Sequence, residues 1–107
     1  MVETDFELRL LGPSDAPALA ALEAAVFLDA WDAARFDGLL GQDRFLAVGA
    51  FNASGLCAYL TAYSVAAELE IVNVAVASAL RGQGIGRALL QFFLEQGRLA
   101  GARRAVL

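Results

Sequence analysis

The chain has 107 residues, the size of one domain with a single core, and its hydrophobic fraction of 59 % excludes a disordered chain. No apolar run reaches the roughly 18 residues that a membrane-spanning helix needs, so we expect no membrane partner. The net charge is −4, and the basic residues are all arginines without the cationic stripe of a nucleic-acid binder. The acidic first residues lack the basic start of a secretory signal, which favours a cytoplasmic protein.

The missing residue types exclude several chemistries. The chain contains no histidine, so neither a Ser-His nor a Cys-His catalytic pair can be built from it. Its one cysteine, Cys57, excludes a disulfide framework and a cysteine zinc site, and no metal site is expected. Because Cys57 lies in an apolar run, we expect a buried structural thiol.

The N-terminal part of the chain predicts a strand followed by two helices. Residues 6–11 alternate in places between apolar and polar side chains and are followed by a Gly-Pro pair, which predicts a strand and its end. Residues 14–15, Ser-Asp, are good N-cap residues for a helix over residues 18–27, where apolar side chains recur at helical spacing. Asp32 can cap a second, short helix that Gly41 ends.

The middle of the chain predicts three strands. Residues 44–51 and 56–65 are apolar and flank the sequence Asn-Ala-Ser-Gly, which predicts a β-hairpin. Residues 68–76 are rich in β-branched side chains and predict the next strand. Tyr59 and Tyr63 share one face of their strand, because side chains alternate, and are expected to pack in the core or at its rim.

A glycine-rich loop at residues 81–86 leads from this strand into a helix over residues 86–100, after which residues 103–107 predict the start of a further strand. The first amides of a helix have no intrahelical acceptor and the helix dipole adds positive potential there, so the loop could hold a phosphate group. Arg81 and Arg87 flank the loop and could neutralise a pyrophosphate. A flexible turn with solvated arginines is the alternative interpretation.

Two familiar phosphate-binding motifs do not fit this loop. A Walker loop requires a lysine, which the chain lacks. A dinucleotide fingerprint requires GxGxxG near an early strand, whereas here the glycines are spaced Gly82-x-Gly84-x-Gly86. The pattern Arg81-x-x-Gly84-x-Gly86 instead resembles the acyl-CoA pyrophosphate loop of the GNAT superfamily of N-acetyltransferases.

The resemblance extends over nearly the whole chain and is nearest to the RimI group, which acetylates protein N-terminal α-amines. The stretch from Asn73 to Leu90 resembles that group's strand, loop and helix. Upstream, Glu23-Ala-Ala-Val-Phe27 with Trp31, and then residues 44–48, follow the group's N-terminal region in order and spacing. A member of this superfamily would have an α/β fold (α+β in some schemes), with a mixed, mostly antiparallel sheet flanked by helices in the order β-α-α-β-β-β-α-β.

The resemblance implies acetyl-CoA as co-substrate. In such enzymes a bulge splays the fourth strand from the fifth, and the cofactor enters the gap. The backbone of Val74, Ala75 and Val76 would hydrogen-bond the pantetheine arm as an added strand would. The pyrophosphate would be held by Arg81 and by the loop and first helical turn, namely Gly82, Gln83, Gly84, Ile85, Gly86 and Arg87.

The implied reaction is transfer of an acetyl group to an amine, with a protein N-terminal α-amine, such as that of a ribosomal protein, as the expected acceptor. A small amine or antibiotic is an alternative acceptor, and a non-catalytic acyl-CoA binding module is an alternative function.

The catalytic residues implied by the resemblance are a glutamate on the fifth strand and a tyrosine on the following helix, both expected beyond Leu107. Residues 1–107 would then be a single acetyltransferase domain that lacks its C-terminal part, with weak acyl-CoA binding and little or no acetylation. Glu68 remains a weak candidate for a catalytic role, because it shares a strand face with Glu70 and could hold an attacking water or the amine. A solvated strand edge is the alternative for both glutamates, and the oligomeric state stays open.

Overall fold

The computed structural model of the chain describes residues 6–106. Five strands and three α-helices follow one another in the predicted order β-α-α-β-β-β-α-β, which confirms the predicted fold. The elements are β1 (Glu7–Leu10), α1 (Ala16–Val26), α2 (Ala33–Leu40), β2 (Phe45–Asn52), β3 (Gly55–Val65), β4 (Glu68–Val76), α3 (Ile85–Leu99) and β5 (Arg104–Val106). Short 3-10 turns at Pro13–Asp15 and Ser78–Leu80 precede α1 and α3.

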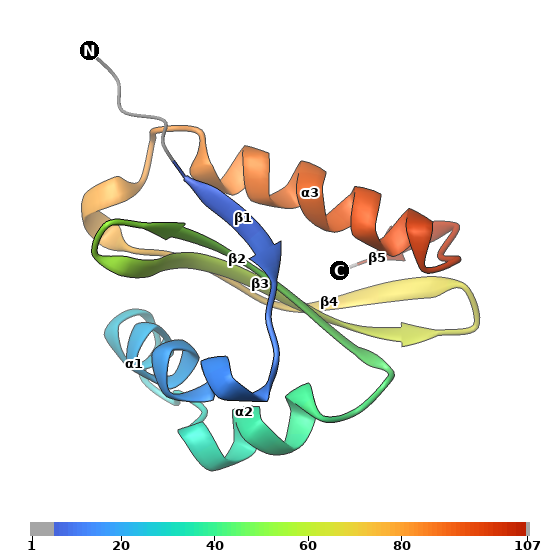
Figure 1. The fold of residues 1–107 in the computed structure, drawn as a ribbon, viewed down its shortest axis with the longest axis horizontal. Coiled ribbons are helices and arrows are strands. Elements are labelled where there is room, and N and C mark those ends of the chain that lie inside the picture. Colours follow the sequence, from blue (N-terminus) through green and yellow to red (C-terminus); the bar gives the residue numbers. More distant parts are fainter. Residues whose placement is uncertain (1–5, 107) are drawn as a thin grey trace.

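The strands form a single sheet whose spatial order equals their order in the chain. Strands β1 to β4 are antiparallel neighbours, and β5 joins the outer edge of β4 in parallel, so the sheet is mixed and mostly antiparallel, as predicted. Helices α1 and α2 lie on one face of the sheet and α3 lies on the other (Figure 1). Among the described residues, no helix combines the length and apolar character needed to cross a membrane.

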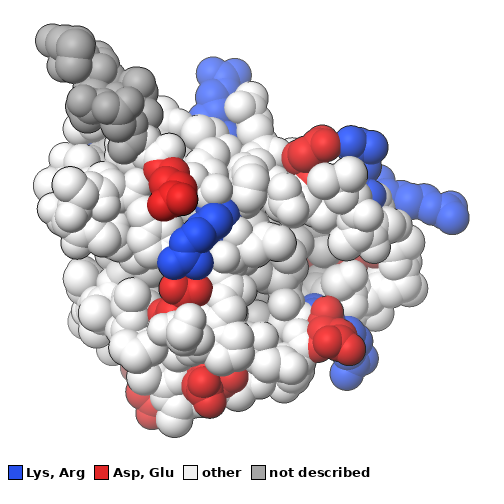
Figure 2. All heavy atoms as spheres, viewed as in Figure 1, with Lys and Arg blue, Asp and Glu red and all other residues white. Residues whose placement is uncertain are grey.

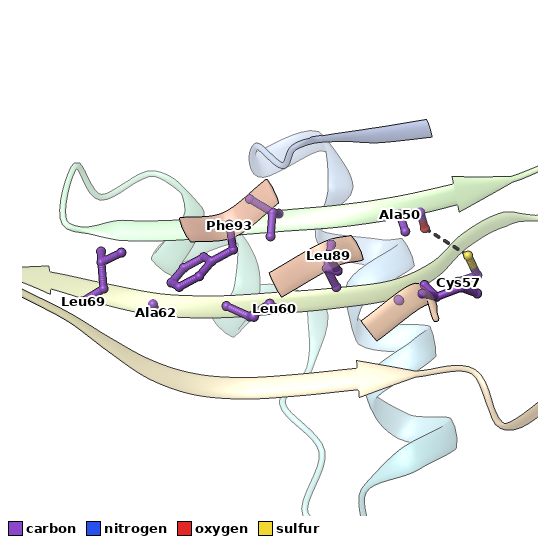
Figure 3. Close-up of a cluster of buried hydrophobic side chains, with 10 residues drawn as sticks. Ala50, Cys57, Leu60, Ala62, Leu69, Leu89 and Phe93 are labelled. Atoms are coloured by element: carbon purple, nitrogen blue, oxygen red, sulfur yellow. Dashed lines mark hydrogen bonds between the residues drawn. The ribbon is translucent and has the colours of Figure 1, made fainter. Parts of the chain in front are cut away.

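Each face of the sheet carries its own hydrophobic cluster. On the α3 face, Leu89 and Phe93 of the helix point onto Leu60 of β3 (Figure 3), and all three side chains are fully buried. On the other face, Leu19 of α1 and Phe36 of α2 pack against the strands. Burying side chains of this size contributes about 1.5–3 kcal/mol each, so both helix layers are held to the sheet mainly by apolar contacts.

Cys57 lies in the cluster on the α3 face and is only 4 % exposed, which confirms the predicted buried thiol. Its Sγ donates a hydrogen bond to the carbonyl oxygen of Ala50 at 3.2 Å (Figure 3). Burial raises the pKa of the Cys57 thiol, because the thiolate would lose its solvation. The residue is therefore suited to packing rather than to nucleophilic chemistry.

The two predicted N-caps behave differently. Asp32 caps α2 as predicted, since its Oδ1 accepts a hydrogen bond from the N–H of Arg35 at 2.9 Å. Asp15 occupies the N-cap position of α1, as predicted, but its side chain does not cap that helix, because it accepts the N–H of Gly12 at 2.9 Å across the preceding 3-10 turn. Pro17 at the start of α1 removes a donor that a cap would have satisfied.

Strand β4 contains a bulge near its middle. The pairs Thr61–Asn73 and Ala62–Ile71 are neighbours in the ladder between β3 and β4, so Val72 has no partner on β3. The N–H of Asn73 donates to the hydroxyl of Thr61 at 3.2 Å. Because side chains alternate with period two, the extra residue places Ile71 and Val74 on the same face of the sheet.

The turn between β3 and β4 consists of two alanines with left-handed backbone angles, Ala66 (φ 50°) and Ala67 (φ 67°). The carbonyl oxygen of Ala67 accepts the N–H of Arg103 at 2.7 Å, just before β5 begins. Left-handed angles cost a residue with a Cβ about 1 kcal/mol, whereas Asn-Gly tolerates them in two-residue hairpins.

We predict that replacing both alanines, as Ala66→Asn with Ala67→Gly, raises the free energy of unfolding by about 1–2 kcal/mol, because it relieves strain at both positions. Urea unfolding measures the change. A matched control is Gly55→Ala in the other hairpin, where φ is 110° and added strain should lower stability. An Asn-Gly variant no more stable than the parent chain would contradict the prediction.

Candidate active site

The loop between β4 and α3 needs two of its predicted glycines for conformational reasons. Gly82 has φ 84° and Gly84 has φ 82°, both in the left-handed region that disfavours side chains. Gly86 has an ordinary φ, and a Cβ there would meet a methyl group of Val76 at 3.8 Å. Gly82 and Gly84 therefore shape the loop, while a small side chain at Gly86 would make only an ordinary contact with Val76.

The N-terminus of α3 presents free amides at the end of this loop. The first intrahelical hydrogen bond runs from the N–H of Ala88 to the carbonyl of Gly84, the N-cap residue, at 3.1 Å. The amides of Ile85, Gly86 and Arg87 therefore have no acceptor within the helix. The helix is 15 residues long, and its dipole adds positive potential at these amides, as a phosphate site requires.

The two arginines of the loop are available to an anion. Arg81 bends back so that its Nε donates to the carbonyl oxygen of Val76 at 3.1 Å, which ties the loop to the last residue of β4. Arg87 is exposed in the first turn of α3. Neither forms an ion pair with a residue in the described range 6–106, whereas the more distal Arg98 and Arg104 are paired with glutamates. Positive charge is thus uncompensated at the loop.

Away from the glycine loop, acidic and basic side chains are interspersed on the surface. On the face shown in Figure 2, red and blue side chains lie beside one another at several points. An ion pair at 3.0 Å joins the exposed Arg9 to the partly buried Asp15, and ion pairs between fully exposed side chains contribute about 0–1 kcal/mol each. The surface pairs therefore do little to hold the site together.

The outer edge of β4 beyond the bulge offers free backbone groups. The N–H of Ala77 donates to Cys57 at 2.8 Å and that of Asn73 donates to Thr61, so these amides face β3. Because successive residues of a strand alternate in direction, Ala75 also faces β3, and Val74 and Val76 face outward. Within the described residues, β5 pairs only with Glu68–Glu70, so this outer edge has no strand partner, and of its outward groups the C=O of Val76 accepts from Arg81.

An apolar groove lies between this edge and α3. It has a volume of about 480 Å³ and is lined by Ile71, Val74, Gly86, Leu90 and Leu94, among others. Val74 is 46 % exposed and Leu94 is 44 % exposed, although both lie beside the core. Of the predicted positions, Val74 and Gly86 line this groove, so it reaches the end of the glycine loop. Gln83, Gly84 and Ile85 line a separate pocket with Phe6 and Leu8. The groove can accept an extended chain that carries amide groups and ends in a phosphate.

The structure does not bring Glu68 to this groove. Glu68 is the first residue of β4, and its Oε2 accepts from Nε of Arg104 at 2.7 Å. It lies six residues from Val74, which is about 20 Å along a strand. Glu70 is exposed near the same end of the strand. Both carboxylates thus belong to the hairpin end of β4.

A buried polar cluster lies on the opposite face of the sheet and was not predicted. Glu23 of α1 is 2 % exposed, and it accepts hydrogen bonds from the Tyr59 hydroxyl, from Nδ2 of Asn73 at 3.0 Å and from the N–H of Trp31 at 3.0 Å. Tyr59 is fully buried, as predicted. The helical pattern held a signal for this cluster, because Glu23 follows Leu19 by four residues on the core-facing side of α1.

Burial raises the pKa of the Tyr59 hydroxyl above its ordinary value near 10, and the hydrogen bond to the Glu23 carboxylate raises it further. The folded protein therefore keeps this proton at a pH where the unfolded chain releases it. Stability from this group is fully present below pH 10 and is lost as pH rises above it.

We predict that Tyr59→Phe is less stable than the parent chain at pH 7 by about 1 kcal/mol, because a hydrogen bond is lost. Above pH 10 the gap should shrink by up to about 1.4 kcal/mol per pH unit, since only the parent chain carries the linked proton. Urea unfolding of both proteins between pH 7 and 11 measures this difference in the free energy of unfolding. A gap that stays constant over this range would contradict the assignment.

Comparison with known proteins agrees with this geometry. Residues 15–107 match the sequence profile of the Acetyltransferase (GNAT) family. A comparison with curated protein sequences finds no match.

Among solved structures, an aminoglycoside acetyltransferase from an uncultured soil metagenomic sample is 26 % identical, with a TM-score of 0.82, and the match covers 96 % of this chain and 78 % of that one. The ribosomal-protein-alanine N-acetyltransferase of Brucella melitensis biovar Abortus 2308 is 24 % identical, with a TM-score of 0.81 and coverage of 95 % and 78 %. AAC(6′)-Iy, solved with the bisubstrate analogue CoA-S-monomethyl-acetylneamine, is 14 % identical, with a TM-score of 0.80 and coverage of 96 % and 78 %.

The last two likenesses show the fold alone, while the profile match spans most of the chain. Together with the glycine loop, the free amides of α3 and the open edge of β4, it identifies the chain as a member of the GNAT family of acetyl-CoA-dependent N-acetyltransferases.

Proposed function

We propose that this protein transfers the acetyl group of acetyl-CoA to the N-terminal α-amine of a protein, such as a ribosomal protein. The observation that carries the proposal is the junction at which the unpaired edge of β4 meets the N-terminus of α3. This junction offers strand-like hydrogen bonding on β4, an apolar groove that reaches Gly86, and uncompensated positive charge at the loop. These are the three properties that an acyl-CoA molecule requires along its length.

The residues present fit acetyl-CoA in a definite order. The outward N–H and C=O groups of Val74 and the N–H of Val76 can pair with the amides of a pantetheine arm, as a strand added to a sheet edge does, while the C=O of Val76 accepts from Arg81. Ala75, whose backbone faces β3, supports that edge from within. The pyrophosphate would lie against the amides of Gly82 through Arg87, including Gln83 and Ile85, with Arg81 beside it.

The reaction forms a bond between the amine nitrogen and the acetyl carbon and breaks the carbon–sulfur bond. The amine must lose a proton and the leaving thiolate must gain one, so a general base and a general acid are needed. Among the described residues, no titratable side chain lines the groove between β4 and α3. Glu68 is not assigned as the base, because it lies at the start of β4 and accepts a hydrogen bond from Arg104 instead of facing the groove.

The protein acceptor is supported by the RimI-like sequence of the α1 and β4 regions and by the likeness to the Brucella enzyme. A second candidate is a small polyamine of the aminoglycoside class, which the 26 % identical aminoglycoside acetyltransferase favours. The net charge of −4 suits either acceptor, because both are cationic before reaction.

We predict that acetyl-CoA stabilises the folded chain and that ATP at the same concentration does not. A ligand at 100 times its dissociation constant that binds only the folded state adds about 2.7 kcal/mol. Thermal unfolding with each ligand measures the shift. Arg81→Ala should weaken acetyl-CoA binding by about tenfold through loss of a charged contact. Arg98→Ala, at the other end of α3, is the matched control and should bind as the parent chain does. Equal shifts with ATP and acetyl-CoA would exclude a specific cofactor site.

Acceptor choice is tested by the release of free thiol from acetyl-CoA. We predict slow turnover with a peptide that has a free α-amine, because no described titratable side chain lines the groove, and none with the same peptide acetylated at its N-terminus, because only the free amine is a nucleophile. Aminoglycosides are assayed in parallel, and turnover with these alone would favour the second candidate. Binding of acetyl-CoA without thiol release for any amine would identify a non-catalytic acyl-CoA binding module.

A further inference from the structure

The Glu23 cluster joins three segments that are distant in sequence. Glu23 itself lies near the end of α1, Trp31 lies in the loop before α2, and Tyr59 and Asn73 lie on β3 and β4. Asn73 contacts both carboxylate oxygens, at 3.0 and 3.3 Å. A single buried carboxylate therefore fastens the α1–α2 loop and two strands together.

No positive charge balances this carboxylate within the described residues, because Glu23 takes part in none of the ion pairs there. A buried charge without a cation is costly, and hydrogen bonds from the hydroxyl, the amide and the backbone N–H are what offset that cost here. A hydrophobic side chain at position 23 would pack the same core without such a cost. The buried carboxylate of Glu23 therefore has a role beyond packing.

The position of Asn73 indicates what the cluster holds. Asn73 follows the bulged residue Val72, and its N–H donates to the Thr61 side chain rather than to a strand carbonyl. It also precedes Val74, whose outer side has no strand partner in the described range. The regular ladder is therefore weakest here, and the side-chain link from Asn73 to Glu23 supplies the missing restraint.

We propose that Glu23 is a positioning residue. Through Asn73 it fixes the bulged segment of β4, so that the outward backbone groups of Val74 stand where the thioester end of the pantetheine arm lies. The consequence for acetyl-CoA rests on the function proposed above, whereas the restraint on β4 is a property of the ligand-free protein.

Three variants of the full chain test this proposal. Asn73→Ala removes the link from a partly exposed position, which should leave the fold intact. Glu23→Gln keeps the link, because the glutamine oxygen can accept from the N–H of Trp31 and its amide can donate to the Tyr59 oxygen and, once the Asn73 amide flips, to Oδ1 of Asn73. Asp15→Asn is the matched control, since it alters a partly buried carboxylate outside the cluster that also accepts a backbone N–H.

The first measurement is amide hydrogen exchange without ligand. In Asn73→Ala the protection factor of the inward amide of Ala75 should fall about tenfold. The protection factor of the Val48 amide on β2 should not change. Glu23→Gln and Asp15→Asn should change the protection of Ala75 by less than about threefold. Unchanged protection of Ala75 in Asn73→Ala would overturn the proposal, as would an equal loss in Glu23→Gln.

The second measurement compares two ligands, acetyl-CoA and 3′-phospho-ADP, which is the CoA head group without pantetheine. Asn73→Ala should weaken acetyl-CoA binding by about tenfold and head-group binding by less than about twofold, because only the former reaches Val74. A parallel loss for both ligands would show general damage and overturn the positioning role. If the parent chain bound neither ligand, the proposed function would fall and the exchange measurement alone would decide the restraint.

Discussion

Val72 has no partner on β3, and this extra residue sets the direction of every side chain that follows it on β4. Without it, Val74 would point to the face covered by α1 and α2, and Asn73 would point toward α3. The groove beside α3 would lose an apolar wall, and the Glu23 cluster would lose its contact with β4. Both halves of the site therefore depend on one interruption of the ladder.

Strand β4 is consequently the wall shared by two different environments. On the α3 side it borders an apolar groove that ends in free helix amides and uncompensated arginines. On the α1 side it is fastened to a buried carboxylate. Because the same few residues serve both sides, a change at Asn73 reaches the groove without touching it, through the backbone of Val74.

The order of elements and the phosphate loop could be predicted because each rests on local signals. Glycines at 82 and 84 are needed for local backbone angles, and Asp32 is placed correctly because its capping partner is three residues away. The bulge was expected only from the family resemblance, since the β-branched side chains of this strand fit either face and do not mark Val72 as the extra residue. The Glu23 cluster was missed because Asn73 lies 50 residues from Glu23 in the chain. Only folding brings those two together.

The left-handed turn at Ala66 and Ala67 bears on the sequence of events during folding. Strands β2, β3 and β4 are connected by two-residue turns, and such hairpins close within about 1–10 μs. β5 can pair with β4 only after α3 has brought the chain back along the sheet. The residue before β5, Arg103, then donates its N–H to the carbonyl of Ala67. Until then the whole outer edge of β4 is open to other chains. Aggregation during refolding should therefore compete with the return of α3 rather than with closure of the hairpins.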